Sequence, residues 1–226
     1  VRQVGLKAVE EAVQKRQLLY DKGGEEHYNI ISALHKSMRS SDPDAALYWM
    51  GRKLEAGEDP LYIARRLIRF ASEDVGNADP QALSVAVAAM QAYQFVGSPE
   101  GELALAQAVV YLATAAKSNA VYAAVNRVRR DIQDTMAEPV PLHLRNPVTG
   151  LMKHLGYGRG YQYDHDFTDH YSGQECLPES LRGRTYYTPG DHGYEKTIKE
   201  RLRLWRRRKQ ALRDERGKRE LPDDGG

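Results

Sequence analysis

The sequence has a single cysteine, Cys176, among its 226 residues. One cysteine excludes an internal disulfide bond and a cysteine-based zinc site, and it fits a reducing, intracellular compartment. No apolar run approaches the roughly 20 residues that cross a bilayer, and the N-terminus lacks a signal-peptide pattern. The chain starts at Val1 rather than at methionine, inside a helical pattern. We therefore expect a soluble, cytoplasmic protein that is a fragment of a longer chain.

The sequence also lacks a P-loop nucleotide-binding motif and carries little net charge. No GxxxxGK[ST] loop occurs, so the phosphate cradle of a P-loop ATPase is missing from these residues. The net charge of +2 is too small to indicate nucleic-acid binding by itself, but the unbalanced lysine and arginine concentrate in the last third. Apolar residues make up 41% and charged residues 28%, which is typical of a soluble globular protein.

A short polar residue followed by proline recurs before stretches with helical apolar spacing. The polar side chain can accept a hydrogen bond from the first turn, and proline gives up a donor that has no partner there. Successive starts are separated by about four helical turns and a short connection, which implies antiparallel neighbours. The expected starts are Asp42-Pro43, Asp59-Pro60, Asp79-Pro80, Ser98-Pro99 and, without proline, Ser118-Asn119. The pattern predicts an all-α fold, an antiparallel helical array.

Two of the expected helices are apolar nearly all round. They cover residues 82–96 and 103–116, and both are rich in alanine, which permits close helix approach. In a soluble protein such helices lie in the centre of the core or are covered by another subunit. We therefore expect a packed helical core with an oligomer face.

The character of the chain changes at Pro139, where prolines, glycines and tyrosines become frequent. One short helix is expected after Asn146-Pro147, followed by the stretch "HLGYGRGYQYDHDF" that begins at His154. These glycines follow a helix instead of leading into one, so they do not form a phosphate cradle. Gly156 is predicted at or near the C-cap of the short helix. The remaining residues up to 193 are predicted to form an extended arm, which is followed by a charged C-terminal helix.

Two histidines and two aspartates in the arm, His165, Asp166, Asp169 and His170, have the side chains that ligate a divalent ion. No regular structure is predicted there to fix their geometry, so a surface loop is the favoured interpretation. No nucleophile elbow or comparable signature supports a hydrolytic site. A metal-dependent enzyme is accordingly the function that the sequence favours least. We predict no catalytic, cofactor-binding or metal-binding residue.

Three groups of arginines are candidates for contact with DNA phosphates, an attraction that needs only grouped cations. Tyr157, Tyr161 and Tyr163 could stack on bases, although such rings more often pin an arm to a helical body. A solvated face with local ion pairs is the commoner role of surface arginines. The candidate DNA contacts are Arg65, Arg66, Arg69, Arg127, Arg129, Arg130, Arg206, Arg207 and Arg208.

Several long segments carry a family resemblance. They are "HYNIISALHKSMRSSDPDAALYWMGRKLEAGEDPLYIARRLIRFASEDVGNADPQAL", "KSNAVYAAVNR", "VPLHLRNPVTGLMKHLGYGRGYQYDHD" and "YYTPGDHGYEKTIKERL". Together they resemble the C-terminal region of the replication-associated recombination protein A family, clamp-loader-like AAA+ ATPases related to Werner-helicase-interacting protein. The resemblance covers residues from about 18 to 204.

The composition and the resemblance together predict four parts, of which the residues beyond 204 are predicted from composition alone. Residues 1–22 would be the end of the AAA+ lid subdomain, and residues 23–138 a clamp-loader-collar-like helical domain through which four subunits assemble. Residues 139–193 would be a short helix and an arm folded back on its own or a neighbouring subunit. Residues 194–226 would be a charged C-terminal helix with a frayed tail.

The resemblance also implies what this stretch does. In the family, ATP and Mg²⁺ are held by motifs upstream of these residues, so this fragment would hold no cofactor and would not be an enzyme, whereas the full-length family member is a DNA-dependent ATPase. The family acts in DNA replication, recombination and repair, with DNA and the single-stranded-DNA-binding protein as partners and no membrane. The leading hypothesis is thus a homotetramerisation collar of a cytoplasmic, nucleoid-associated protein. The alternative is a DNA-binding module that uses the arginine groups and the arm tyrosines.

Overall fold

A computed structural model describes residues 25–135 and 138–220, and these ranges contain helices and turns without a strand. The expected all-α class is confirmed. The packing separates two units, one within residues 1–122 and 190–195 and the other within 123–189 and 196–226. The expected end of the AAA+ lid, residues 1–22, lies outside the described residues. The four parts expected from the sequence stay a prediction.

Two helices begin where an aspartate precedes a proline. The helix α3 (Pro43–Glu55) is capped by Asp42, whose carboxylate accepts a hydrogen bond from the amide of Ala45 at 2.9 Å. The helix α4 (Pro60–Phe70) is capped by Asp59, which accepts from the amide of Leu61 at 2.9 Å. The caps satisfy donors that have no partner within the helix, as the sequence predicts.

The next three helices begin a little after their expected starts. They are α5 (Ala82–Val96), α6 (Glu102–Thr114) and α7 (Ala120–Asp134). The carboxylate of Asp79 accepts from the amide of Gln81 at 3.0 Å and from the hydroxyl of Tyr111 at 2.6 Å, so it ties the start of α5 to α6. At α5 the polar residue therefore organises a turn before the helix, whereas at α7 the hydroxyl of Ser118 accepts from the amide of the first helical residue, Ala120, at 3.2 Å.

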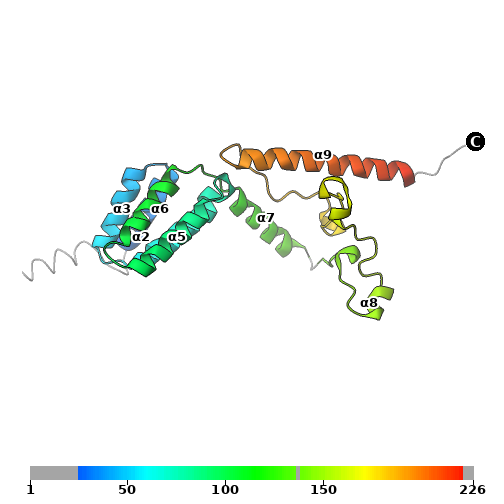
Figure 1. Cartoon of the computed structure of the whole chain (residues 1–226), viewed down its shortest axis with the longest axis horizontal. Coiled ribbons are helices and arrows are strands. Elements are labelled where there is room, and N and C mark those ends of the chain that lie inside the picture. Colours follow the sequence, from blue (N-terminus) through cyan, green and yellow to red (C-terminus); the bar gives the residue numbers. More distant parts are fainter. Residues whose placement is uncertain (1–24, 136–137, 221–226) are drawn as a thin grey trace, which may run out of the picture. The chain divides into compact units, whose positions relative to one another are not determined.

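The helices from α2 (Glu25–Arg39) to α6 share one apolar core within the first unit. The helix α3 packs on α2 and α6, and α5 packs on α4 and runs beside α6 (Figure 1). On α6 the side chains of Leu105, Val109 and Leu112 have no exposed surface. The shared core and the short connections give the helical array that the sequence predicts.

The turn that leads into α9 (Glu195–Glu220) belongs to the first unit. The amide of Tyr194 donates to the carbonyl of Ala78 at 2.8 Å. Gly193 has a φ of +53°, and a Cβ atom there would lie 2.1 Å from the same carbonyl, so only glycine fits. The buried carboxylate of Glu195 accepts from the hydroxyl of Ser118 at 2.7 Å. Residues 193–195 thus contact Ala78 and Ser118, which lie much earlier in the sequence, within the first unit.

The glycine-rich stretch begins as the end of the short helix α8 (Gly150–His154). The amide of Gly156 donates to the carbonyl of Lys153 at 3.0 Å, and that of Tyr157 donates to the carbonyl of Met152 at 3.0 Å. Gly156 has a φ of +83°, which completes a Schellman C-cap. The prediction of a helix end at Gly156 is confirmed.

The arm packs on α9 within the second unit. The ring of Tyr171 stacks on Trp205 with centroids 6.4 Å apart, and its hydroxyl donates to the Trp205 carbonyl at 3.1 Å. At Gly173 a Cβ atom would approach the side chain of Leu212 to 2.9 Å, so this glycine permits close contact with the helix. The described part of the arm therefore folds back on its own chain.

A carboxylate anchors the same contact electrostatically. Glu175 pairs with Lys209 at 3.3 Å and with Arg213. Burial raises the pKa of Glu175, but the hydrogen bond and charge of Lys209, together with Arg213, outweigh burial and hold that pKa below its usual value. Both basic partners lie on α9, so this single arm residue holds two successive turns of the helix.

None of the described helices, including the 26-residue helix α9, combines the length and the apolar character that crossing a membrane requires.

Candidate functional site

The hairpin of α5 and α6 carries the most exposed large apolar side chains of the first unit. Phe95 is 94% exposed and Leu103 is 76% exposed. Other residues of the two helices lie in the core, among them Ala82, Ala86 and Ala89 on α5 and Leu105 and Leu112 on α6. Further exposed apolar side chains on the hairpin are Leu83, Val96 and Val110. We call these five residues, Leu83, Phe95, Val96, Leu103 and Val110, the hairpin surface.

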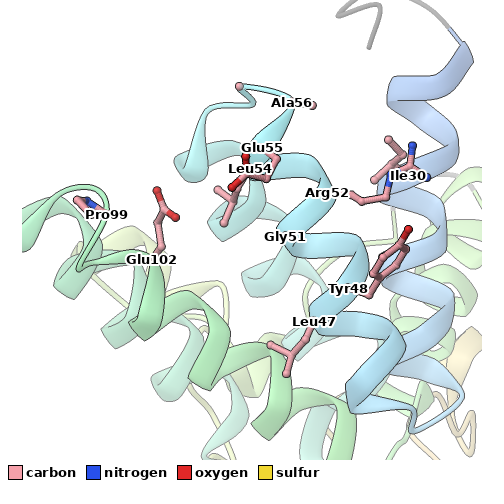
Figure 2. Close-up of a pocket in the computed structure, with 11 residues that line it drawn as sticks. Ile30, Leu47, Tyr48, Gly51, Arg52, Leu54, Glu55, Ala56, Pro99 and Glu102 are labelled. Carbon is pink, nitrogen blue, oxygen red and sulfur yellow. The ribbon is translucent and has the colours of Figure 1, made fainter. Parts of the chain in front are cut away.

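An open groove of about 780 Å³ lies beside α3 in the same unit. Figure 2 shows Tyr48, Arg52 and Glu55 along α3, with Pro99 and Glu102 at the beginning of α6. The residues that line the groove include no serine, threonine, cysteine or histidine. It therefore offers an apolar hollow with a charged rim, formed by Arg52, Glu55 and Glu102.

The three arginines of α4 have three different environments. Arg65 is exposed and lies over the ring of Tyr62 at 5.6 Å. Arg69 pairs with Glu73 at 2.7 Å, one turn further along the chain. Arg66 is half-buried and its Nε atom has no hydrogen-bond partner among the described residues. The sequence places the three together, but within the described part of the chain only Arg65 among them is an exposed cation without an ion pair.

The arginines of α7 divide in the same way. The Nε atom of Arg127 donates to the carbonyl of Tyr186 at 3.0 Å, and the Tyr186 hydroxyl donates to Asp131 at 2.8 Å. This arginine thus fastens the end of the arm to α7. Arg129 and Arg130 are exposed on the same helix.

On α9 two of the three candidate arginines hold the arm. Arg206 donates to the carbonyl of Tyr187 at 3.2 Å. Arg208 pairs with Asp169 and donates to the carbonyl of Thr168 at 3.0 Å. Arg207 is exposed. The cations that remain available to an external phosphate are therefore fewer than the sequence suggests.

The arm tyrosines also differ from one another. Tyr161 is 50% and Tyr163 is 54% exposed, while the ring of Tyr157 lies 5.1 Å from the guanidinium of Arg145. Tyr157 therefore has a partner within the arm, and two rings stay accessible.

The rings of His165 and His170 lie close together, with centroids 4.9 Å apart. Asp169 faces Arg208 instead of a metal position, and Asp166 is exposed. Throughout the described part of the chain, no three His, Cys, Asp or Glu side chains converge so that they could hold a metal ion.

The buried polar residues that the sequence analysis did not identify are His35, Lys53, Ser172 and Glu195, and the first two have shifted pKa values. Lys53 has no exposed surface; its Nζ atom donates to the carbonyl of His27 at 2.9 Å and pairs with Glu58 at 3.2 Å. Burial lowers the pKa of Lys53, and the bond to Glu58 opposes this shift. The burial of Lys53 could have been predicted from helical spacing, because Lys53 falls one turn after Met50 on the buried face of α3.

The other of these residues with a shifted pKa is His35 on α2, which is only 8% exposed. Burial, and then the positive charge of Arg66, lower its pKa from 6.5 to about 4. It lies between Leu34 and Met38 on the buried face of α2, which is again visible as helical spacing. The sequence did not show that α4 lies beside α2 here, or that Arg66 lies near His35.

Comparison with known proteins gives two family models that together cover most of the chain. A model described as the MgsA AAA+ ATPase C terminal matches residues 40–206, and one described as an AAA C-terminal domain matches residues 1–39. Both descriptions concern the C-terminal part of AAA+ proteins.

Individual relatives agree with these models. A replication-associated recombination protein A of Coxiella burnetii is 56% identical over 83% of this chain and 43% of its own length, and that of Escherichia coli K12 is 50% identical over 85% and 43%. An ATPase WRNIP1 of Dictyostelium discoideum is 49% identical over 77% of this chain and 20% of its own length. The chain spans less than half the length of these relatives. It belongs to the MgsA AAA+ ATPase C-terminal family, that of the replication-associated recombination protein A.

Proposed function

We propose that this chain is the oligomerisation module of an AAA+ ATPase, a collar through which four copies assemble for DNA replication-fork maintenance, recombination and repair. The observation that carries the proposal is the hairpin surface, where Phe95 and Leu103 are 94% and 76% exposed. Groups of exposed apolar side chains on soluble proteins mark interaction sites, and identical copies assemble through self-complementary or ring-closing surfaces. Membership of an AAA+ family supports the same role as an oligomerisation module.

The four parts expected from the sequence belong to this proposal. Residues 23–138 would form the collar, preceded by the end of the lid in residues 1–22 and followed by the arm and the charged helix. These residues contain no P-loop motif, which supports an assembly role without ATP hydrolysis of its own. The single-stranded-DNA-binding protein and the nucleoid stay predicted partners.

Light scattering on a gel-filtration peak, over a hundredfold range of concentration, tests the collar. We expect a mass near four times the 25.5 kDa of one chain. Replacing both Phe95 and Leu103 by glutamate should give a monomer, because two charges would be buried at the interface without partners. Leu151→Glu is the matched control, since Leu151 is 70% exposed on α8 in the second unit. A monomer at every concentration of the unmodified chain overturns the proposal.

The second candidate function is a DNA-binding module. Exposed cations at Arg65, Arg129, Arg130 and Arg207, and the exposed rings of Tyr161 and Tyr163, favour it. Fluorescence titration with single- and double-stranded oligonucleotides measures it directly. True phosphate contacts must weaken steeply with salt because bound counterions are released. A flat salt dependence would exclude this role.

A further inference from the structure

A small hollow in the first unit lies between α2 and α4, away from the groove beside α3. It encloses about 290 Å³. Four cationic side chains and one carboxylate, Glu73, are among the residues that line it. The cationic residues are Lys36, Arg39, Arg66 and Arg69. The hollow is therefore strongly biased towards a negative guest.

Two buried polar atoms face this hollow without a partner. They are the Nε2 atom of His35 and the Nε atom of Arg66, and neither has a hydrogen-bond partner among the described residues. His35 is more than nine-tenths buried. A buried donor without an acceptor is costly, and more so when it belongs to a charged group. Two such atoms at one hollow indicate a missing acceptor.

Two of the three neighbouring cations already have acceptors of their own. Arg39 pairs with Asp74 at 2.5 Å, and Arg69 pairs with Glu73 at 2.7 Å. Within the described residues, Arg66 alone of these arginines has no carboxylate partner. The local acids thus pair with Arg39 and Arg69 and leave the charges of Arg66 and of the exposed Lys36 for a guest.

We propose that the hollow around His35 and Arg66 binds a single phosphate-type oxyanion. A guanidinium suits phosphate because its N–H groups match two oxygens of the anion. The hydroxyls of Ser32 and Tyr28 also line the hollow and can donate to the remaining oxygens. The volume of about 290 Å³ is at the lower limit of small-molecule pockets and has room for one phosphate group.

The His35 imidazole is compatible with this guest in both of its charge states. Its lowered pKa keeps the ring neutral at pH 7, when one tautomer donates from Nε2. A bound anion would favour the protonated ring, opposing the effects of burial and of Arg66. The groups that face His35 with charge are Arg66, Asp74, Arg39 and Arg69.

The phosphate can come from a free phosphate compound or from the backbone of a nucleic acid, because both present the same oxygens. The proposal concerns the inside of one array and does not depend on assembly. A failed oligomerisation test would therefore leave it standing, and its own failure would leave the collar proposal unchanged.

Isothermal titration of the 226-residue chain with sodium sulfate and with inorganic phosphate, against chloride at equal ionic strength, tests the proposal. We expect saturable binding of sulfate and phosphate to one site per chain, with a rise in melting temperature that chloride does not give. Arg66→Met should weaken binding by roughly 10- to 100-fold, because it removes a charge-assisted hydrogen bond. The same variant should melt no lower than the unmodified chain in buffer without these anions, since it relieves an unpartnered donor.

Arg65→Met is the matched control. Arg65 neighbours Arg66 on α4 but is exposed and does not line the hollow, so its loss should leave sulfate binding unchanged. Competition by a short oligonucleotide that Arg66→Met abolishes would assign the hollow to a nucleic-acid backbone; binding of the free anion without competition would assign it to a free phosphate. Equal effects of the two variants, or stabilisation by all anions alike, overturn the proposal.

Discussion

In the first unit Leu105, Val109 and Leu112 have no exposed surface, whereas in the second unit no large apolar side chain is buried among the described residues. The buried positions there are Ala124, Ser172, Gly173 and Pro189. The first unit thus has a dry core of the kind that stabilises domains. The second is held by stacking, hydrogen bonds and ion pairs between the arm and α7 or α9. A single family domain therefore combines two modes of stabilisation.

The comparison shows that a long regular helix can form without packing into an apolar core. The helix α9 is the longest in the described chain, yet its contacts with the arm are mainly polar. Exposed pairs of this kind contribute about 0–1 kcal/mol each, against about 1.5–3 kcal/mol for a buried leucine. We expect the second unit to open at lower free energy than the first.

The two tryptophans allow each unit to be followed separately, since Trp49 lies on α3 and Trp205 on α9. Leu112→Ala should destabilise the first unit by about 2–5 kcal/mol, because it removes buried surface and leaves a cavity. Urea unfolding followed by Trp49 fluorescence, in a Trp205→Phe background, measures this. Leu204→Ala, at a 64% exposed position of α9, is the control and should cost under about 0.5 kcal/mol. Similar losses would contradict the separation into cored and uncored units.

Acid should act on the units in different ranges of pH. The pKa of His35 is about 4 in the folded state and 6.5 when unperturbed, so the unfolded chain binds more protons between these values. The first unit should lose up to about 3 kcal/mol as the pH falls from 6.5 to 4. The pKa of Glu175 is lowered from 4.5, so its contribution to the second unit is present above pH 4.5 and is lost below it.

Urea unfolding at a series of pH values, in buffers free of phosphate and sulfate, checks this order. His35→Gln should flatten the dependence reported by Trp49 and leave that reported by Trp205 unchanged. An unaltered slope in the variant would show that other groups govern the acid response of the array.

The smallest expected effect concerns the anchor of the arm. Glu175→Gln removes the charge that holds Lys209 and Arg213, and we expect a loss of about 1 kcal/mol from the second unit, with faster proteolysis of the arm. Glu179→Gln is the control, because its pair with Arg182 is exposed and should contribute almost nothing. If both variants are cleaved at the same increased rate, Glu175 is not the anchor.

Much of the array was predictable because it depends on neighbours in the sequence. Asp42 and Asp59 cap helices through local hydrogen bonds, and Gly156 ends α8 through its own backbone conformation. The apolar stretches 82–96 and 103–116 indicated both a core and an exposed surface. The long segments that resemble the replication-associated recombination protein A family carried the family itself.

The candidate sites were less predictable, because the fate of a charged side chain depends on what the fold brings to it. Arg127 and Arg208 read as free cations in the sequence, but the chain returns to give each a carbonyl from the arm. Arg66 had the same appearance, and the fold set it against His35 of another helix.

The sequence by itself thus determined the helices, the helix ends set by Asp42, Asp59 and Gly156, and the family, because propensity, capping and apolar periodicity are local. Only the tertiary structure decided which arginines are occupied, where the arm rests and which polar atoms stay unpartnered, because Coulomb and hydrogen-bond energies depend on distances between residues far apart in the chain.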